Sequence, residues 1–195
     1  MSGNVLAQKK FANAVLYLLR GCGKPGQTKL LKMLHLADFA HYRKHLSSIT
    51  GGSYVALERG PVLDGYVEHF DSLERHGIVS RNDVAVLGHD KPKTEYLPLA
   101  EPDESVFSRS ELEVLDEVIQ QFGNRSGTFL SDFTHEENGV WSWAWDANAP
   151  GRPIPYTLAR WIDNRCDDRD LRQAQEALAT PEAQAELAAL KSKTA

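Results

Sequence analysis

The chain has 195 residues, of which 42% are hydrophobic and 25% are charged. These values fit one folded domain, with or without a tail, and exclude collagen-like and wholly disordered chains. The longest apolar run has six residues, and there are only two cysteines, so we expect a cytoplasmic protein with no membrane span and no signal peptide. The net charge of -5 is too acidic for a protein that only coats nucleic acid.

The charge is divided unevenly along the chain. Residues 1–50 hold eight Lys and Arg and one acid, Asp38, for a balance of +7. Residues 51–195 hold 14 bases and 26 acids, for a balance of -12. A basic end can steer a molecule toward a polyanion or an acidic protein, but such charges also occur on solvated helix faces.

Two helices are predicted in the basic part of the chain. Residues 4–20 carry apolar side chains at helical spacing, and Thr28 is the expected N-cap of a second helix that runs to about His45. Apolar residues cover most of the circumference of the second helix, so we expect it to be central and buried. Its basic residues are expected to reach water from its ends: Lys29, Lys32, Arg43 and Lys44.

The middle of the chain is predicted to mix strands and helices. Residues 54–57 are a strand candidate, and Gly60 and Pro61 are expected to open a third helix that ends at Gly77, with Asp64 in its first turn. A hairpin is expected next, with strands at 84–87 and 94–99 around a loop at 88–92.

A capping box opens the predicted fourth helix. Ser108 and Glu111 have the required spacing, and the helix is expected to end at Gly123. Further helices are expected at 128–136 and 156–165, separated by irregular residues 138–155. Residues 167–195 are rich in Ala, Gln and Glu and are predicted to form marginal helices.

These elements predict a mainly α, α+β fold. We expect a compact helical domain with a small β-hairpin, in a winged-helix-like order, and a C-terminal helical extension. The domain is assigned to residues 1–160 and the extension to 161–195. This order of elements is a fold analogy and implies no function by itself.

Few residues have the spacing that catalysis or metal binding requires. Asp38, His41 and His45 share one helix face and could hold zinc, but cations lie between the two histidines. His35 lies in an apolar stretch and is expected to be a core histidine. The chain has no nucleophile elbow, phosphate-binding glycine loop or CxxC motif. We therefore expect no enzyme activity, no metal and no cofactor.

Three tryptophans alternate near the end of the domain. In an extended segment Trp141, Trp143 and Trp145 would share one face, whereas in a helix Trp143 would leave the face of the other two. They could form an aromatic platform for a partner, or anchor an irregular loop to the core. We favour the anchoring role for Trp141 and leave the other two open.

Several blocks of the chain, in their order and spacing, resemble the Panacea domain, a family of SocA-like antitoxins and phage-associated proteins. The resemblance covers about residues 8–158, and its first part is the more specific. The matching blocks are 28–39, 41–43, 49–51, 54–56, 59–62 and 130–136, followed by Trp141, Ala144, Gly151, Ile154 and Pro155.

The resemblance implies a small, mostly helical cytoplasmic antitoxin encoded beside a toxin, with no catalytic residues. Family members commonly bind their toxin directly, and toxins similar to alarmone synthetases are frequent partners. One branch instead delivers its toxin to the ClpXP protease. A promoter-binding regulator is a further alternative, although the second helix has little exposed basic surface for DNA. A metal hydrolase that uses Asp38, His41 and His45 is the third alternative function.

Tight neutralisation needs strong contact residues, which are usually Trp, Tyr and Arg. We expect the toxin-facing surface to include such residues near the matched blocks. The candidates are Tyr42, Arg43, Tyr54, Arg59, Trp143 and Trp145. The helices predicted in 167–195 could instead lay an apolar face into a groove of the toxin.

Overall fold

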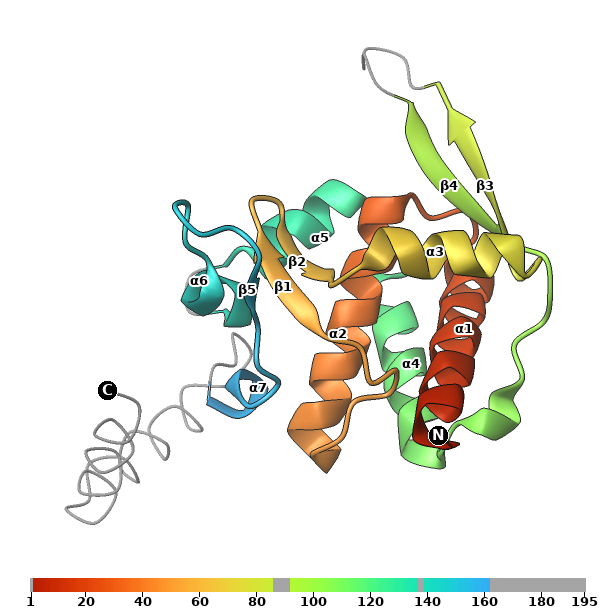
Figure 1. Cartoon of the computed structure of the whole chain (residues 1–195), viewed down its shortest axis with the longest axis horizontal. Coiled ribbons are helices and arrows are strands. Elements are labelled where there is room, and N and C mark those ends of the chain that lie inside the picture. The colour runs from red at the N-terminus through yellow and green to blue at the C-terminus, as the bar shows by residue number, and fades with distance from the viewer. Residues whose placement is uncertain (1, 86–91, 137–138, 162–195) are drawn as a thin grey trace. The chain divides into compact units, whose positions relative to one another are not determined.

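The structure is a computed structural model that describes residues 2–85, 92–136 and 139–161, all within the compact unit Met1–Ile162. In these ranges helices dominate and two small antiparallel sheets accompany them (Figure 1), which confirms the predicted α+β class. The extension predicted for 161–195 lies outside the described residues except for Trp161. No helix in the described ranges combines the length and apolar character needed to cross a bilayer.

Helix α2 (Gln27–His45) is the centre of the unit, as predicted. It contacts α1 (Ser2–Cys22), α4 (Arg109–Phe122), α5 (Gly127–Thr134) and the small sheet. Its buried residues include large apolar side chains but also Lys32 and Asp38. The expectation that Lys32 reaches water is therefore wrong: its side chain is only 1% exposed.

The start of α2 also differs from the prediction. The N-cap is Gly26, which makes no side-chain cap, and Thr28 lies inside the first turn. Gly26 forms an isolated antiparallel bridge with Glu95. This long-range pairing holds the extended conformation that precedes the helix, which a local capping rule does not anticipate.

A three-stranded sheet replaces the predicted start of the third helix. Strand β1 (Tyr54–Leu57) pairs with β2 (Gly60–Leu63) and with β5 (Arg152–Pro153), in the order β2-β1-β5. The prediction that Gly60 and Pro61 open a helix is wrong. Pro61 lies opposite Ala56 on an edge strand, where a residue without an N–H is tolerated.

Helix α3 (Tyr66–Arg75) begins after Gly65, so Asp64 precedes the helix instead of lying in its first turn. The helix leads into the hairpin of β3 (Val79–Val84) and β4 (Lys93–Pro98), which extends away from the helices (Figure 1). The hairpin was predicted, but its first strand begins earlier than expected. Residues 80–83 are polar, so the apolar pattern did not mark them.

Later elements follow the prediction more closely. The short 3-10 helix η1 (Glu104–Val106) precedes α4, and the capping box at Ser108 and Glu111 is confirmed. The predicted irregular segment 138–155 contains the short helix α6 (Val140–Ala144) as well as β5. The last described helix is α7 (Leu158–Trp161).

Candidate partner-binding surface

The turn between β1 and β2 presents Glu58 and Arg59 to solvent. Leu57 lies opposite Gly60 in the hairpin register, and both turn residues are exposed. Gly60 has a φ of 94°, a conformation that side chains with a Cβ rarely adopt. The turn therefore depends on glycine at this position.

Lys32 holds this turn from the interior. Its Nζ donates to the backbone oxygens of Arg59, at 2.6 Å, and Pro61, at 2.9 Å. A Cβ at Gly60 would overlap Lys32 Nζ and would lie 3.0 Å from His135 Nε2. Glycine is therefore required here by close packing as well as by its backbone conformation.

Three bases, Lys32, His35 and His135, lie close to one another beneath the turn. Burial lowers the pKa of Lys32 to about 7. Burial and the positive charge of Lys32 lower the pKa of His35 to about 3, and the same two causes lower the pKa of His135. Nδ1 of His35 and Nε2 of His135 are buried without a hydrogen-bond partner among the described residues. Protonation of Lys32, His35 and His135 is therefore less favourable here than in water.

Helix α6 supports the turn from a second side. Trp141 Nε1 donates to the backbone oxygen of Leu57 at 2.8 Å, and its ring packs on His135 and stacks on Trp145. Trp141 thus anchors the chain, in agreement with the role favoured from the sequence. Because the segment is helical, Trp143 leaves the face of the other two tryptophans, and its side chain is 69% exposed.

Asp38 forms a second buried polar centre on α2. Its carboxylate accepts hydrogen bonds from the backbone N–H groups of Ile49 and Thr50, each at 2.8 Å. It also accepts from the hydroxyls of Thr50 and Tyr54. Burial raises the pKa of Asp38, and these hydrogen bonds oppose the shift. The carboxylate is therefore occupied in joining α2 to the 49–54 segment.

The residues of the zinc alternative are engaged elsewhere. His41 hydrogen-bonds to the Ser47 carbonyl and to Ser110 Oγ, and its ring packs on His45. In the ranges that the structure describes, no group of three or more His, Cys, Asp or Glu side chains could hold a metal ion.

The six predicted contact residues fall in different environments. Arg59 and Trp143 are exposed and lie on the turn and on α6, which the Trp141 hydrogen bond joins. Trp145 is partly exposed beside them. At the end of α2, Arg43 is exposed and Tyr42 stacks on Tyr156.

Tyr54 is the exception among the six. Its side chain is 2% exposed and its hydroxyl donates to Asp38. It cannot contact a partner in this conformation, so we remove it from the candidate surface. We call the β1–β2 turn and α6 together the turn–α6 surface.

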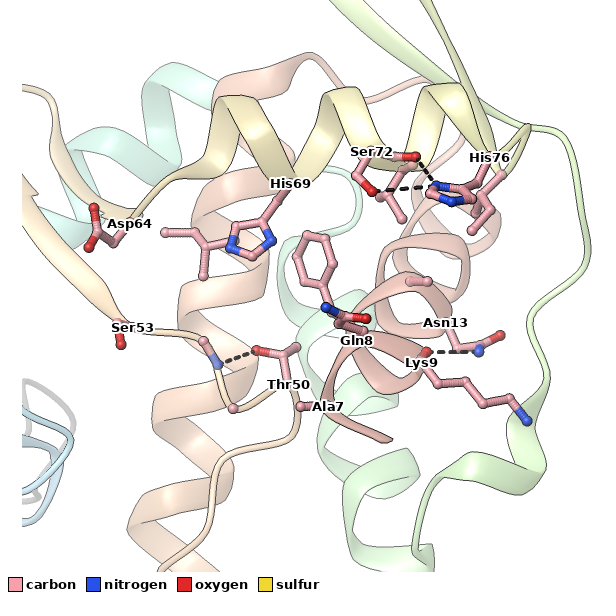
Figure 2. A pocket seen from close by; sticks show the side chains of 17 residues that line it. Ala7, Gln8, Lys9, Asn13, Thr50, Ser53, Asp64, His69, Ser72 and His76 are labelled. Atoms are coloured by element: carbon pink, nitrogen blue, oxygen red, sulfur yellow. Dashed lines mark hydrogen bonds between the residues drawn. The ribbon is translucent and has the colours of Figure 1, made fainter. Parts of the chain in front are cut away.

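A cavity of about 870 Å³ lies on another part of the unit, between α1, the 50–53 loop and α3 (Figure 2). It is lined by apolar side chains such as Phe11 and Leu73 and by polar ones such as Asp64 and His69. None of the six predicted contact residues lines it. The sequence did not reveal this cavity, because it requires elements far apart in the chain to pack side by side.

The model of a protein family described as antitoxin SocA-like, Panacea domain, matches residues 30–142. The match covers more than half of the chain and includes most of α2, the β1–β2 turn and part of α6. No curated protein and no solved structure matches the chain.

Proposed function

The chain belongs to the Panacea-domain family of SocA-like antitoxins, and from this membership we propose that it neutralises a cognate protein toxin by binding it directly. An antitoxin role in general follows from the family. The mode of action and the contact surface are the parts that we propose. The sequence resemblance makes an alarmone-synthetase-like enzyme the first toxin class to test.

The observation that carries the proposal is the exposed Trp143 on a helix that is fixed to the Arg59 turn. Trp143 is 69% exposed, so much of its apolar surface is in water and would be buried by a partner that packs on it. Trp and Arg are also the residues most often found as binding hot spots. We therefore assign the toxin contact to the turn–α6 surface.

The support beneath this surface favours tight binding. Lys32 and Trp141 hold the backbone of the turn through three hydrogen bonds, and Gly60 allows the positive φ that the turn requires. A surface that is already ordered loses less conformational entropy when a partner binds. Arg59 and Trp143 can then contribute most of their contact energy to affinity.

We propose no catalytic step. Lys32 and Asp38 are ionisable side chains with shifted pKa values, and both are at most 1% exposed. Their hydrogen bonds go to the backbone or hydroxyls of the same unit. Neither side chain can contact a substrate in this conformation.

The test is co-expression with the protein encoded by the neighbouring gene, in a host whose growth that protein arrests. We expect the wild-type chain to restore growth and to co-elute with the toxin at a fixed ratio. Arg59→Ala and Trp143→Ala should each weaken rescue and co-elution. Arg109→Ala, which removes an exposed guanidinium on α4, is the matched control and should act as wild type.

Three outcomes would contradict direct neutralisation at this surface. Full rescue by both Arg59→Ala and Trp143→Ala would place the contact elsewhere. Rescue that disappears in a host without the ClpXP protease would favour delivery to proteolysis. A chain that binds its own promoter with steep salt dependence, and binds no toxin, would instead be a regulator.

A further inference from the structure

The cavity between α1, the 50–53 loop and α3 has a size that suits a small molecule (Figure 2). Its volume of about 870 Å³ falls in the range of about 300–1,000 Å³ that is usual for ligand pockets. Three parts of the chain form its walls: α1, the 50–53 loop with the end of β2, and α3 with the residues after it. The structure therefore holds a preformed hollow that is large enough for a ligand of low molecular weight.

One part of the cavity lining is apolar. Phe11, Leu63 and Leu73 are buried core residues that also line the cavity. The His69 ring packs on Phe11, with the ring centroids 5.2 Å apart. This wall can bury the apolar body of a ligand, because apolar surface gains free energy when it leaves water.

A few polar side chains of the lining are available to a ligand. Within the described ranges, four of them have no hydrogen-bond partner in the chain: Gln8, Ser53, Asp64 and His69. Other polar residues of the lining, such as Asn13 and His76, already bond to the backbone. A small number of available polar groups beside an apolar wall is what fixes the orientation of a bound ligand.

Ser53 and Asp64 lie together on one side of the cavity (Figure 2). The Asp64 N–H donates to the Ser53 carbonyl oxygen at 2.8 Å, just beyond the last register pair of β1 and β2. Residues that lie opposite each other in this way present their side chains on the same face. A carboxylate and a hydroxyl are therefore placed to accept hydrogen bonds from one ligand group.

The charges of the lining favour a cation at this side. Lys9 is paired with Asp103 at 3.0 Å, and Figure 2 shows Lys9 on the opposite side of the cavity from Asp64. Asp64 has no ion-pair partner in the part of the chain that the structure describes, and a carboxylate oxygen of Glu68 lies 3.6 Å from the Cβ position of Gly65. With its histidines neutral, the lining therefore keeps an uncompensated negative charge beside Ser53.

We propose that this cavity binds a small organic cation, with a protonated amine at Ser53 and Asp64 and an apolar body against Phe11 and Leu73. The apolar wall supplies most of the affinity, and the Asp64 carboxylate selects the charge. The site goes beyond the proposed function, since none of these residues belongs to the turn–α6 surface.

The test uses the full-length, isotope-labelled chain and three probes that share a phenyl ring. Phenethylamine carries a positive charge at neutral pH, phenethyl alcohol is neutral and hydrocinnamate is negative. Each probe is titrated while the backbone amide signals are followed by two-dimensional NMR. We expect saturable shifts at residues 50–53 and on α3, a Kd for the amine at least about threefold below that of the alcohol, and the weakest binding for the anion.

Three variants locate the site and the source of its selectivity. Asp64→Asn keeps the size of the side chain, so the amine should lose its advantage while the Kd of the alcohol stays unchanged. Asp132→Asn, at an exposed carboxylate on α5 outside the lining, is the matched control and should keep that advantage. Ala12→Leu fills the cavity from α1 and should weaken the binding of both probes.

Two kinds of result would overturn the proposal. The site is wrong if no probe gives saturable shifts at concentrations up to about 10 mM, or if the shifts fall on α6 instead of residues 50–53. The ligand class is wrong if the amine and the alcohol bind the wild type equally, or if the amine keeps its advantage in Asp64→Asn.

Discussion

Asp38 and Lys32 are two ionisable residues on one helix, and both are buried, yet their surroundings differ. Asp38 accepts hydrogen bonds from two backbone N–H groups and from the hydroxyls of Thr50 and Tyr54, and the Tyr156 hydroxyl donates to it at 3.4 Å. Lys32 donates to two carbonyls and has two histidines, His35 and His135, as basic neighbours. The acid is surrounded by donors, whereas the base is surrounded partly by other bases.

Asp38 is a structural centre, whereas Lys32 lies beneath the proposed turn–α6 surface. Hydrogen bonds offset much of the cost of burying the Asp38 charge, and they join α2 to the 49–54 segment. The Lys32 charge is less well compensated, as its pKa of about 7 indicates. Local inconsistencies of this kind often accompany functional sites, and here Lys32 holds the turn that presents Arg59.

The largest expected effect is the loss of the Asp38 carboxylate. Asp38→Ala leaves four buried donors without an acceptor, so the free energy of unfolding should fall by about 3–5 kcal/mol. Urea unfolding would measure it. Asp64→Ala, at an exposed carboxylate, is the control and should change stability by less than about 0.5 kcal/mol. A loss below about 1 kcal/mol in Asp38→Ala would mean that Asp38 is not a structural centre.

The next effect concerns the pH dependence of stability. Between pH 7 and 10.5 the unfolded chain keeps a proton on Lys32 that the folded chain tends to lose. Because the unfolded state binds more protons, this residue makes stability rise with pH, by at most about 1.4 kcal/mol per pH unit. Lys32→Met should remove that rise.

Midpoints of urea unfolding, measured for wild type and Lys32→Met at several pH values between 7 and 8.5, would test this prediction. The comparison with Lys32→Met isolates the residue, since raised pKa values of other groups, such as Cys22 and Tyr54, act in the opposite direction at higher pH. Equal slopes in wild type and Lys32→Met would show that the buried lysine is not the source. The comparison with Asp38 would then lose its electrostatic basis.

A smaller effect is expected from Gly60→Ala. The substitution imposes a side chain on a left-handed backbone and forces Lys32 Nζ to move, so we expect a loss of about 2 kcal/mol. Gly23→Ala is a close control, because Gly23 has φ 71° but nothing within 4 Å of a new Cβ. The difference between the two losses measures the close contacts of the new Cβ with Lys32, His135 and Thr134. Equal losses would mean that only the backbone conformation matters.

Local signals in the sequence predicted much of the fold. The apolar circumference of α2 predicted a central helix, and the capping box at Ser108 marked the start of α4. The hairpin was expected, but its polar first strand was placed too late. The Gly60–Pro61 pair is typical of a helix start, and only its pairing with β1 makes it a strand.

The sequence predicted less of the candidate site than of the fold, for a physical reason. Nothing local indicates that Lys32 is buried or that Tyr54 bonds to Asp38, because both facts depend on segments that meet only in the folded chain. Arg59 and Trp143 were named from residue type and position, and the structure leaves both exposed.

The most direct test of the central claim is a calorimetric titration of the purified neighbouring-gene protein into the chain. The wild type and an Arg59→Ala, Trp143→Ala double variant would be compared at one salt concentration. Direct neutralisation at the turn–α6 surface predicts a tight complex whose Kd rises by about 100-fold or more in the double variant. An unchanged Kd would contradict the assignment of the toxin contact to this surface.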